Sequence, residues 1–207
     1  MAGRPAGGVM GDASSARRTI AGRLIVVVGP SGAGKDTLMS YAAQHLKERP
    51  EVVFVRRVIT RDGGSGGEDH DAVSDAAFRR MSQSGGFAVW WEAHGLCYGI
   101  PIETRHQIDL GHVVVANGSR AALPHFSAAF PAMTVINVTA RPEVLATRLE
   151  SRGRETRDEI LRRLQRSSPQ LVGPYELLTI DNSGSIEEAG QAMVDAVTRY
   201  LPAFSCR

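Results

Sequence analysis

Short apolar runs and helix-spaced apolar positions alternate along most of the chain. The run Leu24–Val28 is uninterrupted and rich in β-branched residues, which is typical of a strand buried on both faces of a parallel sheet. After the glycines that end this run, apolar residues recur at helical spacing from Leu38 to Leu46, and the pattern stops at Pro50. The pattern therefore predicts a central strand, a glycine-rich loop and a helix in direct succession.

Further strands and helices follow from the same periodicities. Buried core strands are expected at residues 52–59, 112–116, 133–139 and 177–180, with an aromatic strand at 87–91. Helices are expected to begin after Ser74, at Pro101, at Pro142 and after the capping residues Thr156 and Ser185. Because strands alternate with helices, we expect a three-layer α/β fold around an approximately five-stranded parallel sheet.

The length of the chain sets its domain organisation. At 207 residues it is long enough for one substantial core, so we expect one domain with a small inserted subdomain. Residues 1–22 are rich in Gly, Ala, Arg and Ser, which indicates a disordered leader, with an organelle transit peptide as the alternative. The glycine-rich residues 62–67 are too flexible for the core. Residues 202–207 form a short tail.

Charge and composition disfavour several classes of function. The formal net charge is +2, from 24 basic and 22 acidic residues, so no strong overall field favours nucleic acid or an anionic membrane as a partner. The arginines cluster locally, which favours a polyanionic small ligand, although a solvated basic helix face explains some of them equally well. No apolar run approaches the ~18 residues of a membrane span. Cys97 and Cys206 form no C-x-x-C pair, so a cytoplasmic protein is expected, and a homodimer stays open.

The strongest chemical signal is the loop after the first strand. Its residues are Gly29, Pro30, Ser31, Gly32, Ala33, Gly34 and Lys35. Glycines let successive backbone N–H groups turn inward around a phosphate, and the following helix presents the positive end of its dipole. Lys35 adds a mobile charge for the outer phosphates of ATP. An ordinary glycine-rich turn is the alternative, but the spacing and the strand-loop-helix context favour a phosphate-binding loop.

The residue after the lysine departs from the usual form of this motif. Such loops end in Gly-Lys-Ser/Thr, whose hydroxyl binds Mg²⁺, whereas here Asp36 takes that position and Thr37 follows. A carboxylate is a suitable magnesium ligand, so Asp36 is a candidate metal ligand, directly or through water. The alternative is an acidic residue in the first helical turn that is stabilised by the helix dipole. The sequence does not choose between the two.

Several short sequence motifs along the chain match the motifs of a known family, and they occur in the same order. They are Thr60-Arg61 with Gly67-Glu68-Asp69, Trp91-Glu92-Ala93-His94-Gly95 with Tyr98-Gly99, and Arg148-Leu149 with Arg152-Gly153-Arg154. Over residues 23–201 the chain thereby resembles the guanylate-kinase-like branch of the P-loop kinases. The resemblance implies a P-loop NTPase fold with an acceptor-binding insertion at about 61–105 and an arginine lid at about 150–160.

Four short motifs make the resemblance more specific within this branch. They are Gly34-Lys35-Asp36, Arg57–Arg61 with Gly67–His70, Ala93–Leu96 with Tyr98–Ile100, and Val115–Arg120. Within the branch they resemble the ribose 1,5-bisphosphate phosphokinase family, whose members make 5-phosphoribosyl 1-diphosphate in phosphonate breakdown. The resemblance implies phosphoryl transfer from ATP to ribose 1,5-bisphosphate with Mg²⁺ as cofactor.

The resemblance also implies roles for individual residues. It implies Lys35, Arg152 and Arg163 as catalytic residues, and Arg154 with the loop through Thr37 for ATP. The implied acceptor-binding residues are Arg61, Glu68, His70, His94, Tyr98, Asn117 and Arg120. Guanidinium groups suit the charge that spreads over a transferred phosphoryl group. The two histidines lack a second ligand at metal spacing, which disfavours zinc.

Structural explanations stay open beside several of these roles. Arg61 is an ordinary surface charge in the alternative interpretation. Glu68 is then a loop glutamate without a partner, and Tyr98 a core tyrosine. Asp181-Asn182 resembles the adenine-side turn of these kinases, but a strand-ending Asx turn accounts for it equally well.

Two departures from true guanylate kinases bear on the acceptor and the metal. Gly63 and Gly64 stand where a second phosphate-binding arginine is expected, and Asn117 stands where those kinases have aspartate. We hypothesise that Asp36 supplies the carboxylate lost at Asn117. The alternatives for the function are a nucleoside monophosphate kinase with the same fold and a non-catalytic guanylate-kinase-like binding module. The intact loop and the lid arginines speak against the module.

Overall fold

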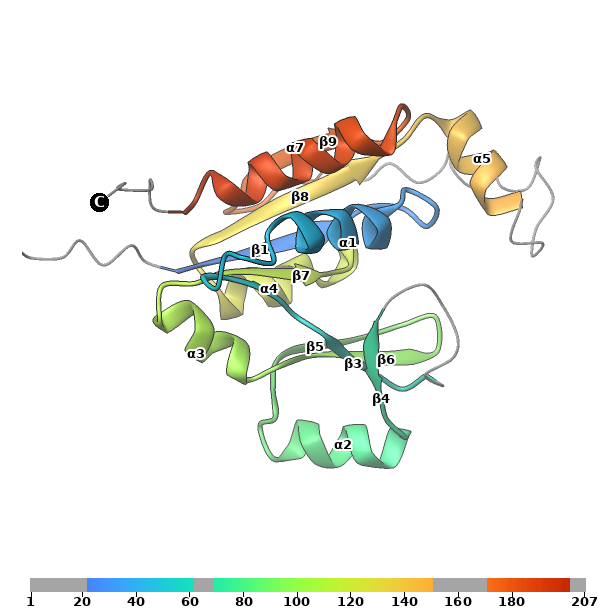
Figure 1. Cartoon of the computed structure of the whole chain (residues 1–207). Helices are drawn as coiled ribbons and strands as arrows, with labels where there is room; N and C mark the ends of the chain where they lie inside the picture. Colours follow the sequence, from blue (N-terminus) through green and yellow to red (C-terminus); the bar gives the residue numbers. More distant parts are fainter. Residues whose placement is uncertain (1–21, 62–68, 151–170, 202–207) are drawn as a thin grey trace, which may run out of the picture.

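The computed structural model describes residues 22–61, 69–150 and 171–201, and these form two sheets (Figure 1). The larger, or core, sheet has five parallel strands in the order β2-β7-β1-β8-β9. Their bounds are β1 (Arg23–Val28), β2 (Val52–Phe54), β7 (Val113–Asn117), β8 (Met133–Thr139) and β9 (Glu176–Asp181). The predicted α/β fold with a central first strand and about five parallel strands is confirmed.

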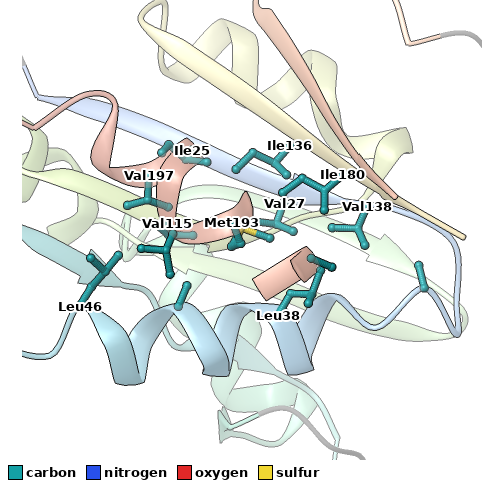
Figure 2. Close-up of a cluster of buried hydrophobic side chains, with 14 of the residues drawn as sticks. Ile25, Val27, Leu38, Leu46, Val115, Ile136, Val138, Ile180, Met193 and Val197 are labelled. Carbon is teal, nitrogen blue, oxygen red and sulfur yellow. The ribbon is translucent and has the colours of Figure 1, made fainter. Parts of the chain in front are cut away.

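Two helices cover one face of the core sheet. They are α1 (Lys35–His45) and α7 (Ile186–Thr198). In Figure 2 the β1 side chains Ile25 and Val27 pack in one cluster with Leu38 of α1 and Met193 of α7. Each such side chain contributes roughly 1.5–3 kcal/mol when fully buried. The cluster therefore holds the start of α1, and with it the glycine loop, against the end of β1.

A second apolar cluster lies on the opposite face of the core sheet. Leu24 and Val26 alternate with the residues of the first cluster and pack with Phe126 of α4 (Leu123–Ala129). α3 (Glu103–Asp109) precedes β7, the short helix η1 (Arg120–Ala122) follows it, and α5 (Pro142–Glu150) follows β8. Successive side chains of β1 therefore point alternately into the two apolar clusters, as expected of a strand buried on both faces.

The second sheet lies between α2 (Asp75–Gln83) and the core. Its order is β4-β3-β6-β5, and its strands are β3 (Arg57–Ile59), β4 (His70–Ala72), β5 (Phe87–Ala93) and β6 (Leu96–Pro101). The outer face packs on α2 through Val58, Phe78 and Phe87. The opposite face carries Trp91 and Ile100 into the cluster of Phe126. We call this the inner face of the second sheet.

The prediction of one strand over residues 52–59 is wrong, because the chain leaves the core sheet within this segment. β2 pairs with β7 up to Phe54, and the N–H of Val55 then donates a hydrogen bond of 2.9 Å to the carbonyl of Val115. After Arg56 the chain continues as β3, which pairs antiparallel with β6. The first half of this apolar run therefore belongs to the core sheet, and the second half belongs to the second sheet.

The prediction that Pro101 begins a helix is also wrong. Pro101 is the last residue of β6, opposite Phe87, and α3 begins at Glu103. Proline is tolerated beside a β-bulge, and the β5-β6 register shifts between Phe87 and Val89. The N–H of Ile102 donates to the carbonyl of Gly86 at 3.0 Å, which holds this corner of the sheet.

The predicted caps that fall in the described residues are confirmed. Ser74 accepts a hydrogen bond from the N–H of Ala77 at 3.3 Å, and Ser185 accepts one from the N–H of Glu188 at 3.2 Å. These contacts satisfy free amides in the first turns of α2 and α7. The helix expected after Thr156 lies outside the described residues.

Candidate active site

The glycine loop turns between β1 and α1 at the carboxyl edge of the core sheet. Gly32 and Gly34 have φ angles of 84° and 87°, the left-handed region that favours glycine. The ammonium group of Lys35 donates hydrogen bonds to the carbonyls of Gly29 at 3.1 Å and Pro30 at 3.2 Å. The lysine therefore lies folded along the loop, with its charge at the position where a phosphate would meet the start of α1.

Asp36 and Asn117 meet beside this loop. β1 and β7 pair with Val27 opposite Asn117, so the end of β7 lies next to the strand that leads into the loop. The side-chain amide of Asn117 donates a hydrogen bond of 2.7 Å to Oδ1 of Asp36. Asn117 is 4% exposed, whereas Asp36 is only half-buried. Within the described part of the chain, no hydrogen bond is made to the second carboxylate oxygen, Oδ2.

Asn182 connects the end of β9 to the glycine loop. Its backbone N–H donates to the carbonyl of Thr139 at 2.8 Å, and its side-chain amide donates to the carbonyl of Ala33 at 2.8 Å. The side chain is 3% exposed, and its Oδ1 has no hydrogen-bond partner among the described residues. Asp181 makes the Asx turn, one of the two explanations that the sequence left open, by accepting a hydrogen bond from the N–H of Ser183 at 3.0 Å. The sequence pattern did not predict the contact of Asn182 with the loop.

Two arginines also lie at this edge of the core sheet. Arg148 lies in the last turn of α5 beside the loop, and an added Cβ at Gly34 would lie 3.9 Å from its Nη1. Arg120 donates to Oδ1 of Asn137 at 3.3 Å, while its buried Nε has no hydrogen-bond partner among the described residues. Burial lowers the pKa of Arg120, because the surroundings disfavour the charged form. An anion at this edge would offset that cost.

The inner face of the second sheet holds Tyr98, and Arg61 lies just beyond the end of β3. Tyr98 stacks on Trp91 with ring centroids 5.4 Å apart and lies opposite Ile59 in the β3-β6 pair. Arg61 follows β3, and its buried Nε has no hydrogen-bond partner among the described residues. Thr60 holds the chain against β6, since its Oγ1 accepts from the N–H of Cys97 at 2.9 Å. Tyr98 is half-buried, with its ring in this apolar layer.

The two histidines of the predicted site have different surroundings. His70 is 7% exposed at the start of β4, opposite Arg57. His94 is exposed at the tip of the β5-β6 hairpin with a φ angle of 53°, and Gly95 follows at 74°. Two consecutive positive φ angles are typical of the tight turns that join adjacent antiparallel strands. His94 therefore has a turn-forming role in addition to any contact with a ligand.

Part of the predicted site lies outside the described residues. These positions are Glu68, Arg152, Arg154 and Arg163.

Among the residues that are described, no group of three or more His, Cys, Asp or Glu side chains is arranged to hold a metal ion. In the same residues no helix has the length and apolar character required to cross a bilayer.

The parallel core sheet, the glycine loop and the smaller second sheet define a P-loop protein with the guanylate kinase fold. A crystal structure of guanylate kinase from Anaplasma phagocytophilum matches this fold with a TM-score of 0.61 over 86% of each chain, at 18% sequence identity. A family model described as an AAA domain matches residues 25–167. The first match shows the fold, and the second shows that residues 25–167 belong to the AAA domain family.

Similar proteins of known name identify the family within the P-loop proteins. The chain is 61% identical over 173 residues to ribose 1,5-bisphosphate phosphokinase PhnN of Rhizobium etli (strain CIAT 652), covering 84% of this chain and 88% of that protein. It is 57% identical over 174 residues to the protein of the same name from Agrobacterium fabrum (strain C58 / ATCC 33970), covering 84% and 95%. The chain belongs to the ribose 1,5-bisphosphate phosphokinase family. The family expected from the four sequence phrases is confirmed.

Proposed function

We propose that the chain transfers the terminal phosphoryl group of ATP to ribose 1,5-bisphosphate, giving ADP and 5-phosphoribosyl 1-diphosphate. The observation that carries this proposal is the 61% identity, over most of both chains, to a protein named for that reaction. The site supports it with a phosphate-binding loop on the core sheet and arginine and tyrosine side chains on the second sheet. These are the two halves that a transfer between two phosphates requires.

The glycine loop forms the ATP side of the proposed site. Backbone N–H groups at the start of α1 and the ammonium group of Lys35 supply donors for the β- and γ-phosphates. Lys35 donates to the carbonyls of Gly29 and Pro30, and its ammonium group would exchange these acceptors for phosphate oxygens of ATP. Asn182 would help to hold the loop in this conformation through its hydrogen bond to the carbonyl of Ala33.

Asp36 and Asn117 fit the needs of a magnesium ion that accompanies ATP. Mg²⁺ keeps several waters and binds through one or two carboxylates plus substrate phosphates, so a single half-buried carboxylate is sufficient. When bound, the ion neutralises charge on the β- and γ-phosphates. We propose that Asn117 orients Asp36 through the bond to Oδ1 and leaves Oδ2 directed at the metal or its water. This pair would take the place of the usual hydroxyl and strand-end aspartate.

The acceptor side of the proposed site needs orientation more than proton transfer. The acceptor phosphate is already ionised, so catalysis depends on positioning and on neutralising charge. We propose that Arg61 and Tyr98 hold this phosphate on the inner face, with Glu68, His70 and His94 at its margin. Arg120 and Asn117 would contact the acceptor from the core sheet, and Arg152, Arg154 and Arg163 would close over the transferred group.

A panel of acceptors tests the proposal. Purified protein with ATP and Mg²⁺ is expected to convert ribose 1,5-bisphosphate much faster than GMP, as measured by ADP formation and by phosphorus NMR of the diphosphate product. Preferential turnover of GMP would instead assign a nucleoside monophosphate kinase. Absence of turnover with every phosphorylated acceptor would assign a binding module.

A further inference from the structure

We propose that Thr60 positions Arg61 for the accepting phosphate, because its side-chain hydroxyl ends β3 by taking the place of its own carbonyl. The inference rests on the proposed function, in which Arg61 holds that phosphate. The sequence placed Thr60 in a family motif but gave it no role of its own. In this assignment Thr60 is a positioning residue, which acts through Arg61 and does not touch the substrate.

The hydrogen-bond ladder between β3 and β6 reaches Thr60, one residue beyond the end of β3. Ile59 lies opposite Tyr98 in this antiparallel pair, so Thr60 falls opposite Cys97. The N–H of Thr60 donates a hydrogen bond of 3.1 Å to the carbonyl of Cys97. In an antiparallel ladder, the two residues of such a pair exchange two hydrogen bonds. The regular pattern therefore predicts a return bond from the N–H of Cys97 to the carbonyl of Thr60.

The return bond goes to the side chain of Thr60 instead of its carbonyl. The N–H of Cys97 donates to Oγ1 of Thr60 at 2.9 Å. Threonine hydroxyls can replace a backbone acceptor in this way, and so compete with regular secondary structure. The N–H of Cys97 stays paired, while the main chain is released from the sheet after Ile59, the last residue of β3. The hydroxyl of Thr60 therefore decides where β3 ends.

The end of β3 fixes the start of Arg61. Because a peptide group is planar, the direction of the Thr60 carbonyl also sets the direction of the Arg61 N–H. If this carbonyl returned to the ladder, the peptide group would rotate and β3 would continue through Thr60. Arg61 would then leave its half-buried position, where its Nε has no hydrogen-bond partner among the described residues. That position presents a guanidinium group suited to phosphate oxygens.

The chemistry of threonine suits this role and offers a matched pair of variants. Its two branches at Cβ restrict χ1, which keeps the hydroxyl in one direction. Valine has nearly the same shape and a high preference for strands, but it has no hydroxyl. In Thr60→Val the carbonyl of residue 60 is therefore the ladder acceptor left for the N–H of Cys97. Thr60→Ser keeps the hydroxyl and loses only the methyl group.

Steady-state kinetics of Thr60→Val and Thr60→Ser test the assignment. Thr60→Val is expected to raise KM for ribose 1,5-bisphosphate roughly tenfold or more, because a displacement of about 1 Å in a positioning group is costly. KM for ATP should stay within about twofold, since the glycine loop lies on the core sheet and keeps its own contacts. Thr60→Ser should remain close to the unmodified enzyme. Equal rises for both substrates, or a serine variant as impaired as the valine variant, would overturn the proposal.

A double-mutant cycle with Arg61→Gln separates positioning from a general loss of structure. Arg61→Gln alone should lower kcat/KM for ribose 1,5-bisphosphate by roughly 10- to 100-fold, the size of a charged hydrogen bond. Adding Thr60→Val should then change the value by less than about twofold, because the side chain through which Thr60 acts is already gone. Effects that multiply would show that Thr60 acts independently of Arg61. If Thr60→Val does not fold, Thr60→Ala removes the same hydroxyl and takes its place in the cycle.

The same measurements distinguish a failure of this inference from a failure of the proposed function. If the unmodified enzyme does not phosphorylate ribose 1,5-bisphosphate, the proposed function fails before any variant is measured. The cycle then uses the acceptor that the enzyme does phosphorylate, because Thr60 and Arg61 serve the accepting phosphate whatever group carries it. Absence of turnover with every phosphorylated acceptor would overturn both.

Discussion

The side-chain amide of Asn117 donates a hydrogen bond of 2.7 Å to Oδ1 of Asp36, a residue 81 positions earlier in the chain. The sequence led to the hypothesis that the carboxylate missing at the end of β7 is supplied by Asp36. The structure brings the two side chains into contact beside the glycine loop. If Asp36 supplies the carboxylate that is missing at Asn117, the two side chains have to lie close together, as they do. Whether Asp36 binds Mg²⁺ can be tested by substitution at these two positions.

We expect Asp36→Ser to lower kcat by roughly 100-fold and to raise the Mg²⁺ concentration needed for half-maximal turnover, because a preorganised charged group is lost. The double variant Asp36→Ser with Asn117→Asp should recover much of the activity, since it restores the usual hydroxyl and strand-end carboxylate. Turnover at varied Mg²⁺ measures both effects. Unchanged magnesium dependence in Asp36→Ser would show that this carboxylate does not serve the metal.

We expect Lys35→Met to lower kcat/KM for ATP by roughly 100- to 1000-fold, since a cation directed at developing phosphate charge is removed. The change should leave stability within about 1 kcal/mol, because each hydrogen bond of the lysine to a loop carbonyl, at 3.1 and 3.2 Å, makes a modest net contribution. Steady-state kinetics and urea unfolding measure the two quantities. A loss of activity accompanied by an equal loss of folded protein would contradict a catalytic role.

We expect Asn182→Leu to raise KM for ATP about tenfold and to cost about 1–3 kcal/mol of stability, because the carbonyl of Ala33 loses its buried donor. Ser183→Ala is a matched control in the same turn, since that side chain contacts Asp181 and the N–H of Arg141 but not the loop. Nucleotide affinity and thermal unfolding report the outcome. Equal effects of the two substitutions would assign Asn182 to the turn alone.

We expect Arg152→Ala and Arg163→Ala each to lower kcat much more than they weaken ATP binding. Guanidinium contacts to a transferred phosphoryl group strengthen in the transition state, and arginine fingers contribute roughly 10³–10⁵ in rate. Equilibrium binding of a nonhydrolysable ATP analogue, compared with single-turnover rates, separates the two quantities. A loss that appears entirely in the binding constant would argue against the lid role.

Stability should fall at alkaline pH through Tyr200. Burial, followed by the hydrogen bond of 2.6 Å that its hydroxyl donates to Glu176, raises the pKa of Tyr200 above its ordinary value. As the pH rises, the hydroxyl of Tyr200 therefore loses its proton in the unfolded chain before it does so in the folded protein. The stabilisation that Tyr200 gives the folded state is complete below the ordinary pKa of tyrosine and is lost as the pH rises through the pKa of the folded protein. Tyr200→Phe should cost about 1 kcal/mol at pH 8 and flatten the alkaline part of a urea-unfolding profile. An unchanged profile would contradict the assignment.

Local pattern was sufficient for much of the fold. The apolar run of β1, the limits of β8 and the caps at Ser74 and Ser185 depend on residues close in the chain, so the sequence alone located them. The run 52–59 looked like one strand because both halves are apolar, although each half pairs with a different sheet. β4 and β6 are short or contain glycine and proline, and their pairing with β3 defines them better than their own composition.

The sequence by itself determined the phosphate-binding loop, the α/β class and the family, because glycine spacing and short phrases are local properties of the chain. Only the tertiary structure decided which distant side chains share the site. Asn182 reaches Ala33 across 149 positions. Arg57 meets Trp91 and Tyr98 because β6 pairs with β3 on one side and with β5 on the other, where Trp91 lies opposite Tyr98. Such contacts depend on strand order and alignment, which arise when apolar faces pack together and which no single segment encodes.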